Sequence, residues 1–299
     1  ENKVLLLAID VGNLAGSSDK DIVVGREASG GNELYGFTHP GSDPFTSGWS
    51  SIADFAVSTS VDVRDVAIGD FDNANGNDVA YVHLDDDTVG FFSNNGDDTF
   101  TAKADKECDP DNENFGIAII KAYDMDDDGD DDVVCFDDIN DANDEVRYIK
   151  SGGDWTWSSI SIASINFFNV KDAVVGDFDS DGDGDMALVG EWTAIHQETV
   201  YTIDNNGDTD FTVVTESAFS DSDVVVNAIA YVLVGSGADG GPGDLVIAMD
   251  PTGHSLHEIA IFENTVIPEF TTLLAPIVSV LGIVCWNYRR AGKRPDRSL

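Results

Sequence analysis

Basic residues are scarce in this sequence. Fifteen lysines and arginines stand against 57 aspartates and glutamates, which gives a formal net charge of −42 at pH 7. A nucleic-acid-binding surface needs clustered positive charge opposite the phosphates, so nucleic acid is not expected as a partner. Disorder is not expected either, because 42% of the residues are hydrophobic and 16 of them are phenylalanines. The chain contains enough apolar material to bury a substantial core.

Catalytic signatures are also missing. The serines, cysteines and histidines form no nucleophile elbow, and no loop has the pattern that cradles phosphate groups. We therefore expect a protein that is not an enzyme. The sequence has only three cysteines, of which Cys108 and Cys135 could form one disulfide or remain two buried thiols.

Long apolar runs are absent except for one charge-free stretch, Phe270 to Tyr288. As a helix with a rise of about 1.5 Å per residue, this stretch would span roughly 28 Å, close to one bilayer core. Five of the 15 basic residues follow it, in residues 289–299. By the positive-inside rule we expect a transmembrane helix over residues 271–288, a basic cytoplasmic tail over 289–299, and an extracellular chain before them. The alternative is a buried core helix.

Five copies of one pattern occupy most of the chain before that stretch. Residues 63–82, 117–136 and 170–189 align with one another, and residues 4–25 and 226–249 are weaker copies. The aspartates that close the acidic loops are 57, 54, 53 and 59 residues apart along the chain: Asp21, Asp78, Asp132, Asp185 and Asp244. The spacing predicts five structural repeats within residues 1–265.

Each repeat has the pattern of short β-strands. An apolar run such as DVAIGD (65–70) leads into an acidic loop, and a second run such as DVAYVH (78–83) leaves it. Asn-Gly or Gly-Gly pairs at 95–96, 152–153 and 206–207 are typical of hairpin turns. About four strands per repeat match the content of a propeller blade, so we predict an all-β fold, a β-propeller of about five four-stranded blades.

The last repeat is shorter than the others. Only one strand-like run, residues 256–264, follows its second strand. Three strands would leave an exposed edge, which could pair with the N-terminal region or with a neighbouring molecule.

The acidic loops place carboxylates at alternate positions. Counted from the first aspartate, the third and fourth repeats have aspartates at positions 1, 3, 5 and 9 and a glycine at position 6. Calcium takes about six to eight oxygen ligands at about 2.3 to 2.6 Å, and a tight loop of converging carboxylates can supply them. The predicted calcium ligands in these two repeats are Asp124, Asp126, Asp128, Asp132, Asp177, Asp179, Asp181 and Asp185.

The second repeat has a less complete loop. Asp70, Asp72 and Asp78 are present, but Ala74 occupies position 5 and the glycine comes one place late, at Gly76. We predict a weaker calcium site there and none in the first and fifth repeats. The alternative for all these loops is general surface acidity of the kind found in proteins adapted to high salt.

These motifs carry a resemblance to a known family. The segment GDFDSDGDGDMALV (176–189), followed by NNGDTDF (205–211), resembles the FG-GAP or VCBS repeat, the blade unit of calcium-binding β-propellers such as the integrin α-subunit head. The resemblance covers roughly residues 1–265. It implies a structural or adhesive role at the cell surface, with structural calcium and with protein or glycan partners, including other copies of the chain. The alternative is an extracellular lectin or a propeller enzyme that degrades polysaccharide.

The C-terminal region carries a second resemblance. The segment VIPEF (266–270), the apolar stretch and the basic tail resemble, in that order, the PEF-CTERM sorting signal of archaeal surface proteins. The resemblance implies that an archaeosortase, a sorting protease, recognises Pro268, Glu269 and Phe270. It also implies that the membrane helix anchors the chain at least until processing.

Overall fold

The computed structural model divides the chain into two units, Glu1–Asn264 and Thr265–Leu299. The structure describes residues 5–14, 19–27, 33–41, 48–52, 55, 62–83, 88–108, 116–137, 146–163, 168–192, 197–207, 210–218, 224–232, 244–251 and 258–262, all in the first unit. The predicted sorting motif, membrane helix and basic tail lie outside these residues. Within the described ranges, no helix has the length and hydropathy needed to cross a membrane.

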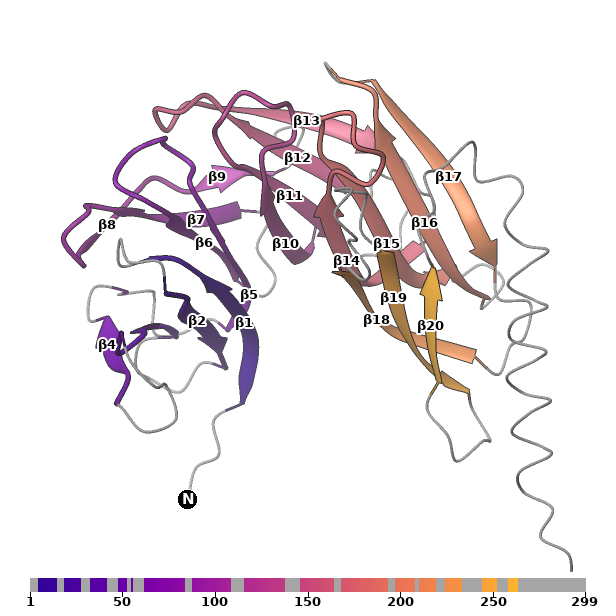
Figure 1. Ribbon diagram of the computed structural model, residues 1–299, viewed down its shortest axis with the longest axis horizontal. Helices are drawn as coiled ribbons and strands as arrows, with labels where there is room; N and C mark the ends of the chain where they lie inside the picture. The colour runs from indigo at the N-terminus through magenta and orange to yellow at the C-terminus, as the bar shows by residue number, and fades with distance from the viewer. Residues whose placement is uncertain are drawn as a thin grey trace, which may run out of the picture. The chain divides into compact units, whose positions relative to one another are not determined.

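The described strands form antiparallel sheets that follow one another along the chain (Figure 1). The first sheet contains β1 (Leu6–Gly12), β2 (Asp21–Arg26), β3 (Leu34–Thr38) and β4 (Ser50–Ile52). The second contains β5 (Val63–Gly69), β6 (Asp78–His83), β7 (Thr88–Asn94), β8 (Phe100–Ala102) and β9 (Lys106–Glu107). Because β8 and β9 both pair with β7, at different positions along it, they act as one interrupted fourth strand.

The remaining sheets repeat this order. The third contains β10 (Ile117–Tyr123), β11 (Asp132–Asp137), β12 (Val146–Ser151) and β13 (Trp157–Ala163). The fourth contains β14 (Phe168–Gly176), β15 (Asp185–Trp192), β16 (Gln197–Asn205) and β17 (Phe211–Ala218). The fifth contains β18 (Val224–Val232), β19 (Asp244–Pro251) and β20 (Glu258–Phe262). The prediction of an all-β chain of repeated four-stranded sheets is confirmed, and the last described sheet has three strands.

The first strand of every sheet has an irregularity at the same place. The pairing register shifts across one residue in each: Leu7, Arg64, Ala118, Lys171 and Asn227. An extra residue of this kind is a β-bulge, which bends a strand and increases its twist. Since the pairing is regular on either side, the five strands can be compared residue by residue. Leu6 corresponds to Val63, Ile117, Val170 and Val226, and Ile9 corresponds to Val66, Ile120, Ala173 and Ile229.

The hydrophobic core lies between successive sheets. The first strands contact one another in chain order, β1 with β5, β5 with β10, β10 with β14 and β14 with β18. Four clusters of buried residues fill the four spaces between neighbouring sheets. Trp155 and Trp157 pack against the cluster between the second and third sheets, where large aromatic rings supply much buried area.

A disulfide joins Cys108 to Cys135 and resolves the alternative that the sequence left open. Cys108 follows β9 in the second sheet, and Cys135 lies in β11 of the third. Both residues are fully buried in the cluster between these sheets. The bond therefore links the second sheet to the third across their shared core.

Candidate metal-binding loops

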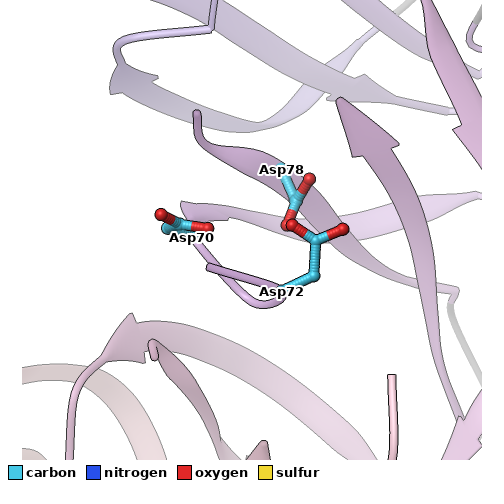
Figure 2. A group of neighbouring side chains, drawn as sticks. All are labelled: Asp70, Asp72 and Asp78. Atoms are coloured by element: carbon cyan, nitrogen blue, oxygen red, sulfur yellow. The ribbon is translucent and has the colours of Figure 1, made fainter. Parts of the chain in front are cut away.

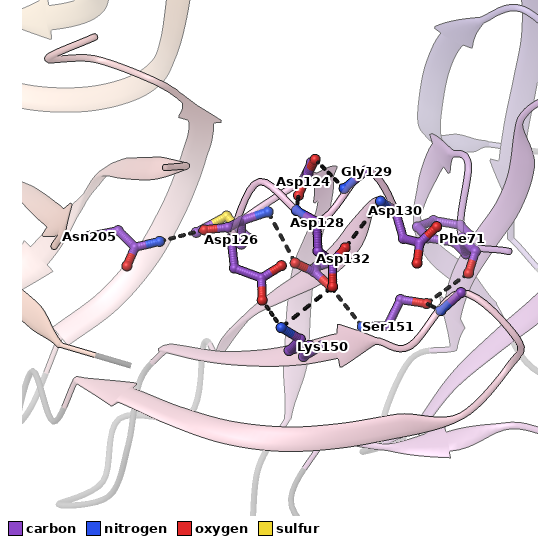
Figure 3. A network of polar contacts seen from close by, with 12 residues as sticks. Phe71, Asp124, Asp126, Asp128, Gly129, Asp130, Asp132, Lys150, Ser151 and Asn205 are labelled. Carbon is purple, nitrogen blue, oxygen red and sulfur yellow. Dashed lines mark hydrogen bonds and ion pairs between the residues drawn. The ribbon is translucent and has the colours of Figure 1, made fainter. Parts of the chain in front are cut away.

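In the first four repeats the acidic loop is held by its closing aspartate, which also begins the second strand of the sheet. Asp132 is buried, and its Oδ2 accepts a hydrogen bond from the Met125 amide at 3.0 Å while its Oδ1 accepts one from the Ser151 amide at 2.6 Å (Figure 3). The carboxylate thus joins the start of the loop to the end of the third strand. Buried backbone amides need such partners, because an unpaired one costs free energy.

The same pair of bonds recurs in the closing aspartates of the first, second and fourth repeats. Each carboxylate accepts hydrogen bonds from two backbone amides: Asp78 from those of Phe71 and Asn94, Asp185 from those of Phe178 and Asn205, and Asp21 from those of Leu14 and His39. The first repeat therefore keeps this link although the described part of its loop gathers no group of three acids. Holding the loop is a role of the closing aspartate that does not require a metal.

The loops of the first three repeats are also tied to the following sheet. Asn94 Nδ2 donates to the Leu14 carbonyl at 2.6 Å, Ser151 Oγ to the Phe71 carbonyl at 2.7 Å, and Asn205 Nδ2 to the Met125 carbonyl at 2.6 Å. In each pair the two residues are 80 positions apart. The sequence motifs NNG and SGG predicted hairpins, but this second role of their first residue was missed.

Left-handed backbone conformations let the loops turn tightly. Position 4 has a positive φ in all three loops: Asn73 (52°), Asp127 (53°) and Ser180 (70°). Position 6 does too: Asn75 (65°), Gly129 (95°) and Gly182 (107°). Asparagine tolerates this conformation better than most residues, so Asn75 replaces the glycine of the other two loops. The late Gly76, with a φ of 102°, adds a further left-handed residue.

The loops bring three aspartates together in each of the second, third and fourth repeats. The groups are Asp70, Asp72 and Asp78 (Figure 2), then Asp124, Asp126 and Asp132, then Asp177, Asp179 and Asp185. One carboxylate oxygen of each residue lies within 4.8 Å of the others in its group. Two oxygens bound to one calcium ion at about 2.4 Å are at most about 4.8 Å apart, so the separations suit a shared ion.

The aspartates at position 5 lie outside these groups. Asp128 Oδ1 accepts a hydrogen bond from the Asp130 amide at 3.1 Å, and Asp181 Oδ1 accepts one from the Asp183 amide at 3.0 Å. Ala74 occupies this position in the second repeat, yet its three aspartates still converge. The sequence argument for a weaker second site rested partly on this position, and the geometry of the three groups does not depend on it.

Burial makes Asp78, Asp132 and Asp185 difficult to ionise without a cation. The pKa of Asp78 is raised to about 8 and those of Asp132 and Asp185 to about 7, mainly by desolvation and to a smaller extent by the charges of neighbouring loop aspartates. The amide hydrogen bonds act in the opposite direction but are outweighed. A divalent cation would favour the ionised carboxylates.

The residue facing each loop from the third strand differs in charge. Ser93, Lys150 and Asp204 occupy equivalent positions, one residue before the end of β7, β12 and β16. Ser93 Oγ donates to Asp72 Oδ2 at 3.1 Å. Lys150 Nζ contacts Asp126 and lies 3.5 Å from Asp128 Oδ2 (Figure 3). The charge of Asp204 raises the pKa values of Asp179 and Asp185.

Lys150 is expected to compete with calcium for the third loop. Its ammonium group occupies the position of a cation beside Asp126, so the lysine must move or share this carboxylate when an ion binds. Replacing Lys150 with methionine should raise the calcium affinity of this loop roughly threefold to tenfold. Calcium titration calorimetry measures the change, and Asp204→Asn is the opposite control, expected to weaken the fourth loop. Unchanged affinity in Lys150→Met would contradict the competition.

The third repeat also contributes to the second loop. Trp155 Nε1 donates to Asp72 Oδ2 at 2.9 Å, and the ammonium of Lys103 lies 4.8 Å from the centre of a Trp155 ring. Trp155 has a left-handed φ of 65° in its hairpin, and its indole reaches across the sheet boundary to Asp72. Asp72 is therefore held from both sheets, and no sequence pattern indicated this contact.

Comparison with known proteins gives a structural relation only. No protein-family model matches the chain, and no curated protein matches it. Among solved structures, the chain is similar to a lectin from Agrocybe aegerita that was studied for its specific recognition of non-reducing terminal N-acetylglucosamine. The TM-score is 0.51 with 15% sequence identity, over 88% of this chain and 67% of the lectin chain. The likeness shows a shared fold, and the FG-GAP or VCBS assignment stays a resemblance of motifs.

Proposed function

We propose that the chain is a calcium-stabilised β-propeller that binds glycans outside the cell. One observation carries the proposal: 88% of the chain follows the fold of a lectin that recognises terminal N-acetylglucosamine. The five sheets, in contact through their first strands, are then propeller blades. Glycan binding would also give a surface protein an adhesive role.

Calcium in this proposal is structural. The three groups of aspartates lie in loops that hydrogen bonds connect to the third strand of their own sheet and to the next sheet. An ion there would stabilise both connections. The closing carboxylates accept hydrogen bonds from buried backbone amides. These carboxylates are therefore poorly placed to exchange protons with a substrate. We therefore favour binding over polysaccharide cleavage.

An open cavity among the first strands, lined by both charged and apolar residues, offers a place for a sugar. Its volume is about 470 Å³, within the range of about 300 to 1,000 Å³ typical of ligand sites. Its lining includes three basic residues, Arg64, Lys121 and Lys171, in a chain that has only 15. Acidic residues such as Asp62 and Asp172 line it too. Charged donors and acceptors together can hydrogen bond to sugar hydroxyl and amide groups.

Binding to immobilised glycans that end in N-acetylglucosamine tests the proposal. We expect saturable binding by the full chain in calcium and at least a tenfold loss of affinity in Lys121→Ala. Lys106→Ala, which removes an equal charge from β9, should bind like the unchanged chain. Binding that survives Lys121→Ala would place the glycan outside the cavity. Absence of binding to any immobilised glycan would reject the lectin function and favour a purely structural surface role.

The proposed location rests on the C-terminal motifs alone. We propose that the segment from Val266 onward anchors the chain at the cell surface, with Pro268, Glu269 and Phe270 as the recognition residues of a sorting protease. Mass spectrometry of the surface-exposed protein from its native host would show whether the tail is present or removed.

A further inference from the structure

The first strand presents an apolar surface that its counterparts bury. Leu6, Ile9 and Val11 are 69%, 64% and 51% exposed. Among the described residues, five of the six large exposed hydrophobic side chains belong to residues 5–11, and the sixth is Val213. Exposed apolar side chains gathered on one strand are typical of an interaction site, whereas single ones are ordinary.

Comparison between repeats shows what normally covers these positions. The residues equivalent to Leu6 and Ile9 in the other first strands are at most 5% exposed. In each case the preceding sheet covers them: Val63 and Val66 pack with Phe55 and Leu34 of the first sheet, for example. Among the described residues no sheet lies before the first one along the chain, and here Leu6 and Ile9 are exposed.

In the fifth sheet, the face equivalent to the one that contacts the next sheet in earlier repeats is partly exposed. Ala230 corresponds to Ala67, which is buried between the second and third sheets, but Ala230 itself is exposed. Val246 and Ala248 of β19 are only half-buried, whereas their equivalents in β6, Ala80 and Val82, are fully buried. No hydrophobic cluster of the described residues joins the fifth sheet to the first.

We propose that the β1 surface of one chain is covered by the β18–β20 sheet of a second copy. The same two kinds of surface already pack together at four places within the chain, so the fifth sheet carries the shape and hydrophobicity that β1 requires. The contact is heterologous, because the two copies use different surfaces, and it can therefore continue from copy to copy.

Net charge sets the conditions for this contact. Two chains that each carry a formal charge of −42 repel one another at low ionic strength. At about 1 M salt the screening length falls to about 3 Å, and the apolar contact is no longer opposed over long distances. Association should therefore strengthen as the salt concentration rises.

Sedimentation velocity of the full chain in a mild detergent, at low salt and at about 1 M potassium chloride, tests the interface. We expect concentration-dependent oligomers at high salt and at least a tenfold weaker association in Ile9→Asp. Val213→Asp is the matched control, since it places the same charge on an exposed apolar residue of β17. Oligomers that Ile9→Asp leaves unchanged, or a monomer at all concentrations, would overturn the proposal.

Cross-linking separates a second copy from closure within one chain. Chains carrying Ile9→Cys are mixed with chains carrying Ala230→Cys, both with Cys285→Ser, and treated with a short bis-maleimide. We expect a covalent dimer from this mixture and none when Val213→Cys replaces Ile9→Cys. If a chain with both new cysteines instead cross-links only within itself, the chain's own fifth sheet covers β1 and the proposal is wrong.

Discussion

Replacing Asp132 with asparagine is expected to lower the Tm of the protein by about 5 to 15 °C even when calcium is absent. The Asp132 carboxylate accepts hydrogen bonds from the buried amides of Met125 and Ser151. A carboxamide has only one oxygen, so it can accept one of these hydrogen bonds while its NH₂ group faces the other amide. One unsatisfied buried donor and one repulsive contact cost about 2 to 4 kcal/mol. In a unit of this size that free energy corresponds to the stated change in Tm.

Asp21→Asn is the control that separates this structural role from metal binding. Asp21 accepts the equivalent hydrogen bonds from the amides of Leu14 and His39. The described residues of its repeat contain no group of three acidic side chains that could share a metal ion. Thermal unfolding in a chelator should show similar losses for both variants. With calcium present, only Asp132→Asn should also bind fewer ions. A Tm within about 2 °C of the unchanged chain for Asp132→Asn in chelator would contradict the structural role.

The periodicity of the aspartates was sufficient to predict the coarse fold. In the first four repeats the closing aspartate makes the same link between its loop and the end of the third strand, and this shared need explains why the residue recurs. The apolar runs on either side of the loops became the first and second strands of each described sheet. Local sequence was informative here because these interactions lie within one repeat.

Contacts between repeats could not be predicted in the same way. The bond from Ser151 to the Phe71 carbonyl joins residues 80 positions apart, and it depends on how one sheet packs on the next. Lys150 was one basic residue among many acids in the sequence, and only the pairing of β11 with β12 places it beside the third loop. Local patterns carry no signal for such positions because the partner is chosen by tertiary packing.

The second loop keeps the geometry of the other two despite a substituted position, and its weaker affinity stays a prediction. Ala74 removes a carboxylate, and Gly76 is displaced by one residue. In the structure Asn75 supplies the left-handed turn, and Asp70, Asp72 and Asp78 still converge. Alternative residues can satisfy one backbone conformation, so a motif with a substituted position can keep its geometry.

Removal of calcium is expected to have the largest effect on stability, and the effect should grow with pH. An ion bound only by the folded state at 100 times its Kd adds about 2.7 kcal/mol, so three sites together add about 8 kcal/mol. A chelator should therefore lower the Tm by roughly 15 °C or more at pH 8. Differential scanning calorimetry with calcium and with chelator, from pH 5 to pH 8, measures this difference.

The pH dependence follows from the direction of the pKa shifts. Burial raises the pKa of Asp78 to about 8 and the pKa values of Asp132 and Asp185 to about 7, above the ordinary value of 3.8. For such groups the folded state binds protons more tightly than the unfolded state, so their stabilising contribution is complete below about pH 4 and is lost as the pH rises through 7 to 8. The metal-free protein should therefore become less stable from pH 5 to pH 8.

Calcium should reverse this trend, because it binds the ionised carboxylates and competes with protons for them. The Tm difference between calcium and chelator is then small at pH 5 and largest at pH 8. Calcium binding near pH 6 should also release protons, and titration calorimetry in buffers of different ionisation enthalpy measures their number. A Tm difference that does not vary with pH would mean that the closing aspartates are not coupled to the ion. No difference at any pH would mean that the loops hold the sheets together through hydrogen bonds alone.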